Sequence, residues 1–217
     1  MIDIYKYTFF DLDGTVTDPA EGITNSVAYA LSKYSIDVTD KTSLYDFIGP
    51  PLIDSFMKHY SFSREDAVEA VEKYREYYRV KGIFENKLYN GIIRLFEDLK
   101  GRGKKIVLAT SKPEKFAVEI LKHFEIYDFF EFVAGATMDE TRTDKGEVIK
   151  YAIDSLGICD TSEIIMVGDR KYDIEGAHKL GIKAIGVMYG YGSLEELQTA
   201  KADYIVENTK EIEDIIF

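Results

Sequence analysis

Acidic and hydroxyl side chains follow three predicted strands of this sequence. Tyr5–Phe10 is an aromatic run that predicts a buried strand, and Asp11 and Asp13 come directly after it. The polar residues that follow two later strands are Thr110, Ser111 and Lys112, and Gly168, Asp169 and Asp173. Each group alone is typical of a turn. Because ligands of an open α/β sheet bind beyond the carboxyl ends of its strands, we expect all three groups to meet at one edge.

The carboxylates of Asp11, Asp13 and Asp169 at one edge would repel one another unless a cation lies between them. A hard divalent ion such as Mg²⁺ binds carboxylate oxygens and often a phosphate as well. A lysine and a hydroxyl group at the same edge match the oxygens of a phosphoryl group. The alternative is that the three carboxylates are separate and solvated, which a chain of net charge −12 permits.

Lys145 gives an independent indication of an anion site. Asp144 and Glu147 form a capping pair that places Lys145 in the first turn of a helix. A cation there interacts unfavourably with the helix dipole, which costs about a few tenths of a kcal/mol. Such local conflicts are common at functional sites, although a tolerated surface lysine is the alternative.

The elements that must position these residues alternate along the chain after Leu88. The predicted strands are Lys105–Ala109, Phe129–Ala134, Ile164–Val167, Lys183–Val187 and Tyr204–Val206. The predicted helices between them are Pro113–His123, Lys145–Leu156 and Ile174–Leu180. This alternation predicts the α/β class, with a Rossmann-like parallel sheet covered by helices on both faces.

A helical block interrupts this α/β pattern after the first strand. Ala20–Tyr34, Pro51–Tyr60 and Arg64–Val80 carry apolar residues at helical spacing. We therefore expect a small helical cap domain over residues 16–85, inserted into a core formed by residues 1–15 and 86–217. The aromatic residues of this block either form its own core or stack on a substrate; they are Phe47, Phe56, Tyr60, Tyr74, Tyr77, Tyr78 and Phe84.

Composition excludes several classes of function. The chain of 217 residues has 27 lysines and arginines against 39 acids, so its net charge is −12. Such a charge disfavours nucleic acid and an anionic membrane as partners. A single cysteine, Cys159, is typical of a reducing compartment, and no apolar run reaches the length of a membrane span. We expect a cytoplasmic protein, and the sequence leaves its oligomeric state open.

Together these motifs resemble the haloacid dehalogenase superfamily in its phosphatase branch. The resemblance covers essentially the whole chain, with the motifs in the superfamily's order: Asp11-Leu12-Asp13-Gly14-Thr15, Thr110, Lys145, and Gly168-Asp169 through Asp173. The helical block is similar to the cap of phosphoglycolate phosphatase-like members. Phe47-Ile48-Gly49-Pro50-Pro51-Leu52 and the segment from Gly168 to Asp173 resemble a bacterial subgroup often assigned as 5′-nucleotidases.

The resemblance implies a role for each motif residue. Asp11 attacks phosphorus and forms an aspartyl-phosphate, and Asp13 is the general acid and then the general base. Thr110 and Lys145 hold phosphoryl oxygens, with Ser111 in support. Mg²⁺ is bound by Asp11, by the main-chain carbonyl of Asp13 and by Asp169, while Asp173 orients Lys145 or water on the ion. Gly14 permits the tight turn after the strand.

The substrate implied by the resemblance is a small phosphorylated metabolite, a 5′-nucleotide or phosphoglycolate. Gly49 and Pro50 of the helical block are candidates for substrate selection, as is Arg170, which stands where many relatives carry a small hydroxyl residue. An inward Arg170 would contact the substrate or the cap, but we expect it to be a solvated surface charge.

Four other readings of the motifs are possible. A dehalogenase needs no acid two residues after its nucleophile, so Asp13 argues against that activity. A sugar phosphomutase shares all the motifs and differs chiefly in its cap. In a receiver-like signalling module the phospho-accepting aspartate follows the third strand and there is no helical insertion. A catalytically idle interaction module would not need the intact pair of Asp11 and Asp13.

Overall fold

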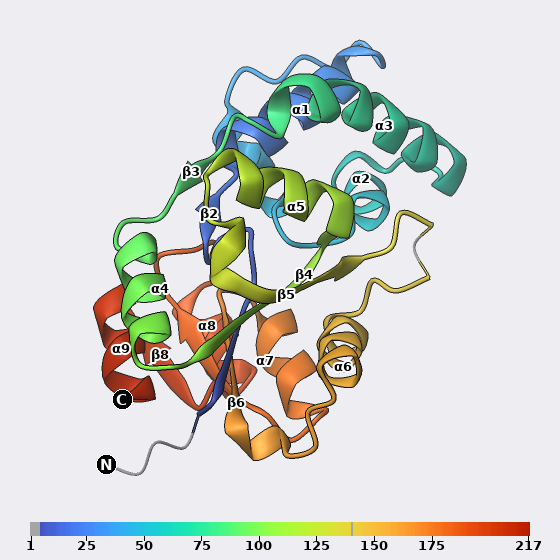
Figure 1. Ribbon diagram of the computed structural model, residues 1–217. Coiled ribbons are helices and arrows are strands. Elements are labelled where there is room, and N and C mark those ends of the chain that lie inside the picture. Colours follow the sequence, from blue (N-terminus) through green and yellow to red (C-terminus); the bar gives the residue numbers. More distant parts are fainter. Residues whose placement is uncertain (1–4, 140) are drawn as a thin grey trace. The chain divides into compact units, whose positions relative to one another are not determined.

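A computed structural model describes residues 5–139 and 141–217, and its chain divides into two compact units. One unit, called the core here, comprises the chain before Asp18 together with Leu88–Phe217. The other, called the insert, is Asp18–Lys87. The division passes through two short paired strands, β2 (Thr17–Asp18) and β3 (Lys87–Leu88). Figure 1 shows the elements of both units.

The core contains a six-stranded sheet in the order β5-β4-β1-β6-β7-β8. Its strands are β1 (Tyr7–Phe10), β4 (Lys105–Pro113), β5 (Phe130–Ala136), β6 (Ile164–Gly168), β7 (Lys183–Val187) and β8 (Tyr204–Val206). Every neighbouring pair is parallel, with Phe9 opposite both Val107 and Met166. The α/β fold with a parallel sheet is therefore confirmed.

Helices cover both faces of this sheet. On one face, Tyr7 and Phe9 of β1 belong to an apolar cluster shared with α6 (Lys145–Leu156), α7 (Lys171–His178) and α8 (Leu194–Thr199). On the other face, Phe10 packs edge to face on Phe96 of α4 (Ile92–Gly101). The remaining core helices are α5 (Glu114–His123), α9 (Thr209–Ile216), η3 (Tyr127–Phe129) and η4 (Thr161–Glu163).

The strand order places β1 at a switch point of the sheet. After β1 the chain adds β4 and β5 on one side and then returns to add β6, β7 and β8 on the other. A crevice opens at such a point beyond the carboxyl ends of the strands. Residues that follow β1, β4 and β6 therefore come together, as the sequence predicts.

The insert is helical and has a core of its own. Its elements are α1 (Ala20–Ser32), η1 (Lys41–Phe47), α2 (Leu52–Tyr60), α3 (Arg64–Tyr77) and the π-helical turn η2 (Tyr78–Gly82). The Phe47 and Phe56 rings pack edge to face at 5.0 Å, and Tyr74 stacks on Tyr78 at 5.3 Å. These four residues are buried and belong to the core of the insert, whereas Tyr60 and Tyr77 are half-buried and Phe84 is exposed.

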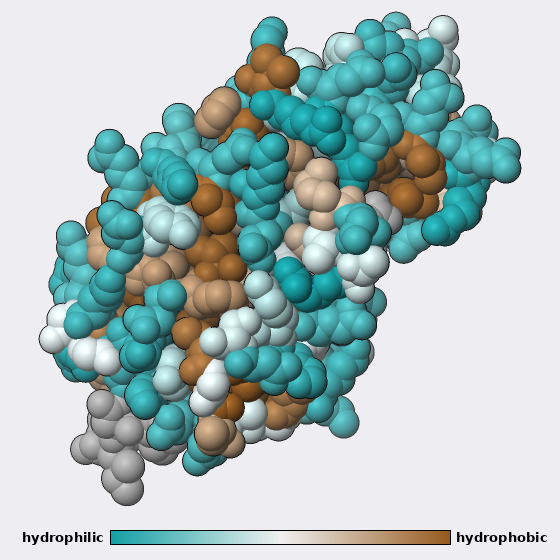
Figure 2. All heavy atoms as spheres, turned by 45° about the vertical axis from the view of Figure 1, so that its right-hand side comes forward, coloured by the Kyte–Doolittle hydropathy of each residue, from teal (hydrophilic) through white to brown (hydrophobic). Residues whose placement is uncertain are grey.

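Most predicted elements are present, and the differences lie at their ends. Lys145–Leu156, Lys183–Val187 and Tyr204–Val206 match the prediction, whereas β4 continues to Pro113 and α7 begins at Lys171. No helix among the described residues is long and apolar enough to cross a membrane. Hydrophilic side chains predominate on the face in Figure 2, in keeping with the high content of charged residues.

Candidate active site

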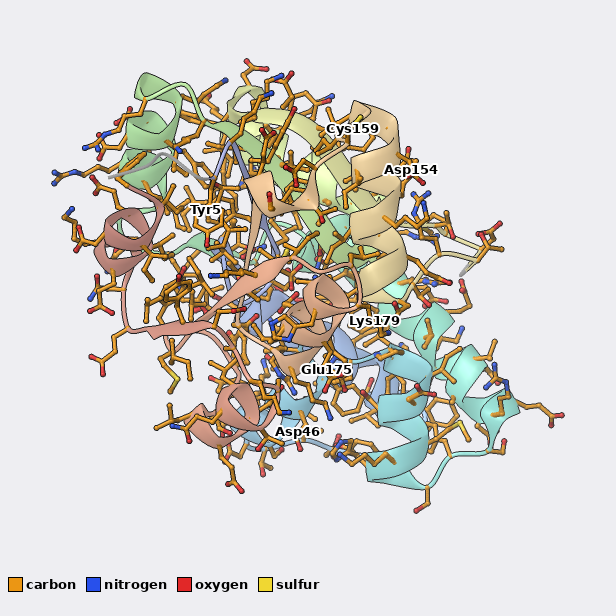
Figure 3. All side chains as sticks on the ribbon, turned by 90° about the horizontal axis from the view of Figure 1, so that it is seen from below. Tyr5, Asp46, Asp154, Cys159, Glu175 and Lys179 are labelled. Atoms are coloured by element: carbon orange, nitrogen blue, oxygen red, sulfur yellow. The ribbon has the colours of Figure 1, made fainter. Side chains whose placement is uncertain are left out.

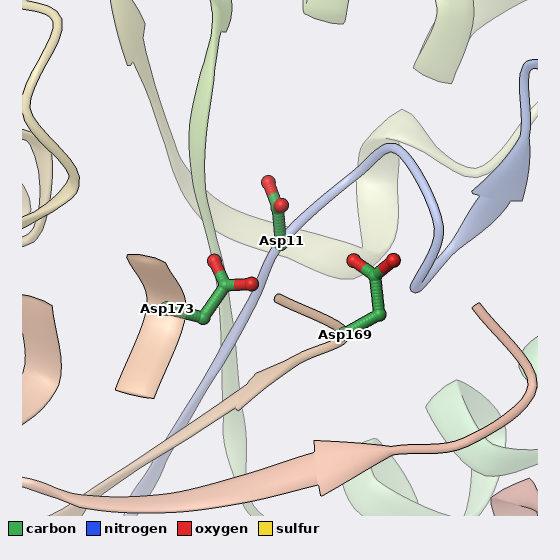
Figure 4. Close-up of side chains that lie close together, drawn as sticks. All are labelled: Asp11, Asp169 and Asp173. Carbon is green, nitrogen blue, oxygen red and sulfur yellow. The ribbon is translucent and has the colours of Figure 1, made fainter. Parts of the chain in front are cut away.

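Three aspartates converge at the carboxyl edge of the sheet. Asp11 follows β1, Asp169 follows β6, and Asp173 lies in the first turn of α7. One carboxylate oxygen from each lies within 4.8 Å of those of the other two, and Figure 4 shows the three side chains lying close together. Asp169 and Asp173 are fully buried, and Asp11 is 9% exposed. At this separation in a buried site, mutual repulsion is strong unless a cation offsets it.

Lys145 neutralises two of these carboxylates. Its Nζ lies 2.7 Å from Asp11 Oδ1 and 2.8 Å from Asp173 Oδ1, and it also donates to the Ala109 carbonyl oxygen. Burial lowers the pKa of Lys145, but the two carboxylates outweigh it, so the pKa is raised above its usual value. Lys145 is therefore a permanent cation between the nucleophile candidate and Asp173.

Asp144 caps the helix that begins at Lys145, as predicted. The Asp144 carboxylate accepts hydrogen bonds from the Gly146 and Glu147 N–H groups and so caps α6. Lys179, which is labelled in Figure 3, follows α7. Its Nζ pairs with the other Asp144 oxygen, Oδ2, at 3.0 Å. The unfavourable position of the Lys145 cation in the first turn of α6 is thus offset by its ion pairs with Asp11 and Asp173.

Asp169 forms no ion pair among the described residues. Its carboxylate accepts the Tyr191 N–H at 2.8 Å and the Thr15 hydroxyl at 3.4 Å. Burial, reinforced by the Asp173 and Asp11 charges, raises the pKa of Asp169 well above its ordinary value. A buried carboxylate that two others crowd fits a hard divalent cation, whose charge would stabilise the ionised form.

Glycines make room for the Asp169 side chain. Gly14 has a φ of +83°, and a Cβ on it would lie 2.1 Å from Asp169 Oδ2. In the loop after β7, a Cβ on Gly190 would also meet the Asp169 side chain, and a Cβ on Gly192 would meet the Asp169 main-chain carbonyl oxygen. In that loop the Tyr189 hydroxyl donates to the Thr15 carbonyl oxygen at 3.1 Å. Sequence reasoning missed this loop, and its glycines after a strand were the available signal.

The Asp13 side chain does not join the three clustered aspartates. Lys112 Nζ lies 2.5 Å from Asp13 Oδ2, and both side chains are largely buried. Asp13 Oδ1 is buried and accepts no hydrogen bond from the described residues. Burial raises the pKa of Asp13 above its usual value, and the Lys112 ammonium opposes that rise.

Thr110 and Ser111 lie beside this pair on β4. Thr110 is buried, and its hydroxyl oxygen accepts the Lys112 N–H at 3.2 Å. Ser111 is half-buried. The Thr110 O–H remains available as a donor, which is the requirement for contact with a phosphoryl oxygen.

The expectation that Arg170 is a solvated surface charge is wrong. Its Nε donates to Glu196 Oε1 at 2.9 Å, and its side chain is 17% exposed. Glu196 lies in the first turn of α8, a pairing distant in sequence that no local pattern shows. The Arg170 N–H also donates to Asp173 Oδ2 at 3.0 Å, which ties the start of α7 to the acidic cluster.

Gly49 and Pro50 belong to the insert, between η1 and α2. Gly49 has a φ of +104°, a conformation that favours glycine. Their part in substrate selection stays a prediction.

The sequence and the fold both have known relatives. Residues 8–187 match the family described as haloacid dehalogenase-like hydrolase. A 5′-nucleotidase of Pseudomonas aeruginosa is 47% identical over 194 residues, which are 89% of this chain and 87% of that protein. The tyrosine-protein kinase PtkA of Mycobacterium tuberculosis is 38% identical over 86% of this chain, a match that spans 63% of PtkA.

Solved structures share the whole fold. The crystal structure of a "predicted phosphatase" from Clostridium acetobutylicum superposes with a TM-score of 0.94 at 48% identity. The match covers 98% of both chains, so it includes the insert as well as the core.

Proposed function

Because the chain belongs to the haloacid dehalogenase-like hydrolases and is a phosphatase of that family, we propose that it hydrolyses a 5′-nucleotide through an aspartyl-phosphate, with Mg²⁺ as its cofactor. The observation that carries this proposal is the arrangement around Lys145, which holds Asp11 and Asp173 at 2.7 and 2.8 Å beside Asp169. That arrangement supplies a nucleophile, a fixed cation and a set of oxygen ligands at one sheet edge.

Asp11 is the nucleophile in this proposal. The Leu12 N–H and Lys145 both bind its Oδ1, at 2.8 and 2.7 Å, so the carboxylate is fixed in orientation before a substrate arrives. A phosphoryl group attacked by Asp11 would lie beside Lys145 and the Thr110 hydroxyl, which would bind its oxygens. Phosphoryl transfer depends mainly on such positioning and charge neutralisation.

Asp13 is the general acid and general base. Asp11 and Asp13 are separated by one residue, yet the structure gives them different partners, Lys145 and Lys112. Asp13 would protonate the leaving oxygen in the first step and deprotonate the attacking water in the second. The raised pKa of Asp13 favours the protonated form that the first step needs.

Asp11 and Asp169 would hold the cation, with the main-chain carbonyl of Asp13 as the third protein ligand and Asp173 in support. When bound, Mg²⁺ supplies positive charge that stabilises the transferring phosphoryl group. The raised pKa of Asp169, together with its lack of an ion pair among the described residues, supports this assignment.

The nucleotide substrate is supported by the 47% identity to the Pseudomonas 5′-nucleotidase over most of both chains. A phosphoglycolate phosphatase of Vibrio parahaemolyticus is 25% identical over 97% of this chain, so phosphoglycolate belongs among the compounds tested.

A phosphate-release screen with Mg²⁺ tests the proposal. It compares 5′-nucleoside monophosphates, sugar phosphates, phosphoglycolate and p-nitrophenyl phosphate, with Asp11→Asn protein as the control. We expect the highest kcat/KM for a nucleotide and a loss of at least about 1,000-fold in folded Asp11→Asn protein. Preference for another phosphomonoester would contradict the nucleotide assignment. Isomerisation of a sugar phosphate through a bisphosphate would indicate a phosphomutase, and hydrolysis by Asp11→Asn protein would contradict the mechanism.

A further inference from the structure

Lys112 has a buried ammonium group, unlike most lysines of the chain. Its side chain is 6% exposed, and its Nζ lies 2.5 Å from Asp13 Oδ2. Lys105, at the other end of β4, pairs with Glu131 at 2.9 Å but is 38% exposed. Burial of an ammonium group is costly unless the group is paired in good geometry. The contact between Lys112 and Asp13 is therefore a buried ion pair and not a chance contact at the surface.

An irregularity in β4 aims Lys112 at Asp13. The register with β5 runs from Ala109 opposite Ala134 to Pro113 opposite Ala136, so four steps along β4 correspond to two along β5. A bulge of this kind redirects the side chains of the strand that carries it. Within the bulge the Lys112 N–H donates to Thr110 Oγ1. Lys112 therefore links Thr110, through its backbone, to Asp13, through its side chain.

The two oxygens of Asp13 have different environments. Oδ2 is bound by Lys112, whereas Oδ1 is buried and has no hydrogen-bond partner among the described residues. A buried polar atom without a partner destabilises a protein. Oδ1 is thus the Asp13 oxygen whose hydrogen-bonding capacity is not used by the described residues.

We propose that Lys112 is a positioning residue of the phosphatase reaction, which holds Asp13 by Oδ2 so that Oδ1 transfers the proton. This inference rests on the proposed function, in which Asp13 is the acid and the base. Lys112 also stabilises the carboxylate that Asp13 becomes once it has given up its proton.

Asp13 Oδ1 gives up a proton in the first step and takes one up in the second. As the Asp11–phosphorus bond forms and the bond from phosphorus to the leaving oxygen breaks, the Oδ1 proton passes to that oxygen. In the second step a water oxygen bonds to phosphorus, its proton passes to Oδ1, and the Asp11–phosphorus bond breaks. Lys112 stays an ammonium throughout.

Loss of a positioned acid matters most when the leaving group is a strong base. Phenyl phosphate and p-nitrophenyl phosphate are similar in size, but phenolate is the stronger base and needs the proton more. We expect Lys112→Met to lower kcat/KM for phenyl phosphate at least about tenfold more than for p-nitrophenyl phosphate. Lys112→Arg keeps a cation at this position and should recover most of the loss.

Lys105→Met is the matched control, because it removes an exposed ion pair from the same strand. It should leave both kcat/KM values within about twofold of the unmodified protein. Equal losses for the two substrates in Lys112→Met would overturn the inference. If the two losses are equal and inorganic phosphate also inhibits Lys112→Met more weakly, Lys112 binds the phosphoryl group. If the two losses are equal and only the melting temperature falls, Lys112 has a structural role.

Asp13→Asn separates this inference from the proposed function. If Asp13 is the acid, its variant shows the same dependence on the leaving group, and adding Lys112→Met increases that dependence no further. A dependence in Asp13→Asn that is absent from Lys112→Met would overturn the role of Lys112 alone. No dependence in either variant would contradict the acid role of Asp13 itself and with it the inference.

Discussion

Gly190 and Asp169 are packed so closely that no side chain fits between them. A Cβ on Gly190 would lie 2.3 Å from the Asp169 Cβ and 2.3 Å from the Gly14 carbonyl oxygen. The next residue, Tyr191, gives its N–H to Asp169 Oδ2. The loop after β7 thus forms one wall of the acidic cluster and holds the carboxylate that has no ion pair among the described residues.

Gly190→Ala should therefore damage the cation site. The added methyl group must displace the loop or Asp169, which we expect to lower stability by about 1–3 kcal/mol. It should also raise the Mg²⁺ concentration needed for half-maximal activity by at least about tenfold, because a ligand is displaced. Activity against Mg²⁺ concentration and thermal melting measure the two effects.

Gly101→Ala is the control for the glycine substitution. Gly101 ends α4, and a Cβ on it would meet no atom within 4 Å. Alanine there should be neutral or stabilise the protein by up to about 1 kcal/mol, with an unchanged need for Mg²⁺. Equal behaviour of the two alanine variants would show that the close packing at Gly190 has no functional consequence.

Asp169→Asn should stabilise the metal-free protein while abolishing its response to Mg²⁺. The amide oxygen can still accept the Tyr191 N–H, but the buried charge that Asp173 and Asp11 repel is gone. At about 2–4 °C per kcal/mol for a protein of this size, we expect the melting temperature at pH 7.5 to rise by a few degrees. A lower melting temperature in chelator would contradict the conclusion that Asp173 and Asp11 repel the Asp169 carboxylate.

The stabilising effect of Mg²⁺ should increase with pH. Burial, partly offset by Lys145, raises the pKa of Asp173 to about 6, and the pKa of Asp169 is also raised. In the unfolded chain these two carboxyl groups ionise near pH 4. Between about pH 4 and 6 the folded metal-free protein therefore holds more protons than the unfolded chain, and its stability falls as pH rises through that range. A cation must displace those protons at low pH but not at high pH.

Melting curves at pH 5.0 and 8.0, each with Mg²⁺ and with chelator, measure this dependence. We expect a larger increase in melting temperature with Mg²⁺ at pH 8.0. An equal increase at both pH values, or a larger one at pH 5.0, would exclude a proton-linked cation site.

The sequence predicts the position of residues that depend on local rules. The position of Lys145 in the first turn of α6 is predicted correctly because Asp144 caps that helix. The position of Asp11 is predicted correctly because an apolar strand precedes it. The alternation of strands and helices is enough to bring Asp11 and Asp169 to one edge, since parallel strands share their carboxyl ends.

Residues whose environment depends on distant partners are not predictable in this way. The pairing of Arg170 with Glu196 depends on how α8 packs beside α7. Lys112 could be named as an edge residue, but its direction depends on a bulge between β4 and β5. The close approach of Gly190 to Asp169 likewise joins two loops of the folded sheet that are separate in the sequence.

Phe56→Ala tests whether the aromatic residues of the insert form its core. Phe56 is fully buried and packs against Phe47 and Phe62, with ring centroids 5.0 and 5.9 Å away. Removing the ring should lower the stability of the insert by about 3–5 kcal/mol. Phe84→Ala is the control, because Phe84 is 49% exposed and should change stability by less than about 1 kcal/mol. Urea unfolding with hydrogen exchange in the insert distinguishes the two variants.

The Gly49–Leu52 segment should influence which phosphomonoester is preferred. The positive φ of Gly49 and the two prolines after it give this loop a fixed backbone at the start of α2. Replacing Pro50 by serine relaxes the backbone without removing any residue of the acidic cluster. We expect the KM ratios among nucleotide, sugar and glycolate phosphates to change by about tenfold, with an unchanged requirement for Mg²⁺.

Ser63→Ala is a matched control for the loop variant. Ser63 caps α3 in the same unit, where its hydroxyl accepts the Asp66 N–H at 3.1 Å. Its loss should cost about 1 kcal/mol of stability and leave every KM ratio unchanged. If Pro50→Ser behaves like Ser63→Ala, with lower stability and constant ratios, the loop merely joins two elements of the insert. If Pro50→Ser and Ser63→Ala lose the same stability but only Pro50→Ser changes the KM ratios, the loop selects the substrate. A less stable insert alone would weaken the binding of all substrates alike.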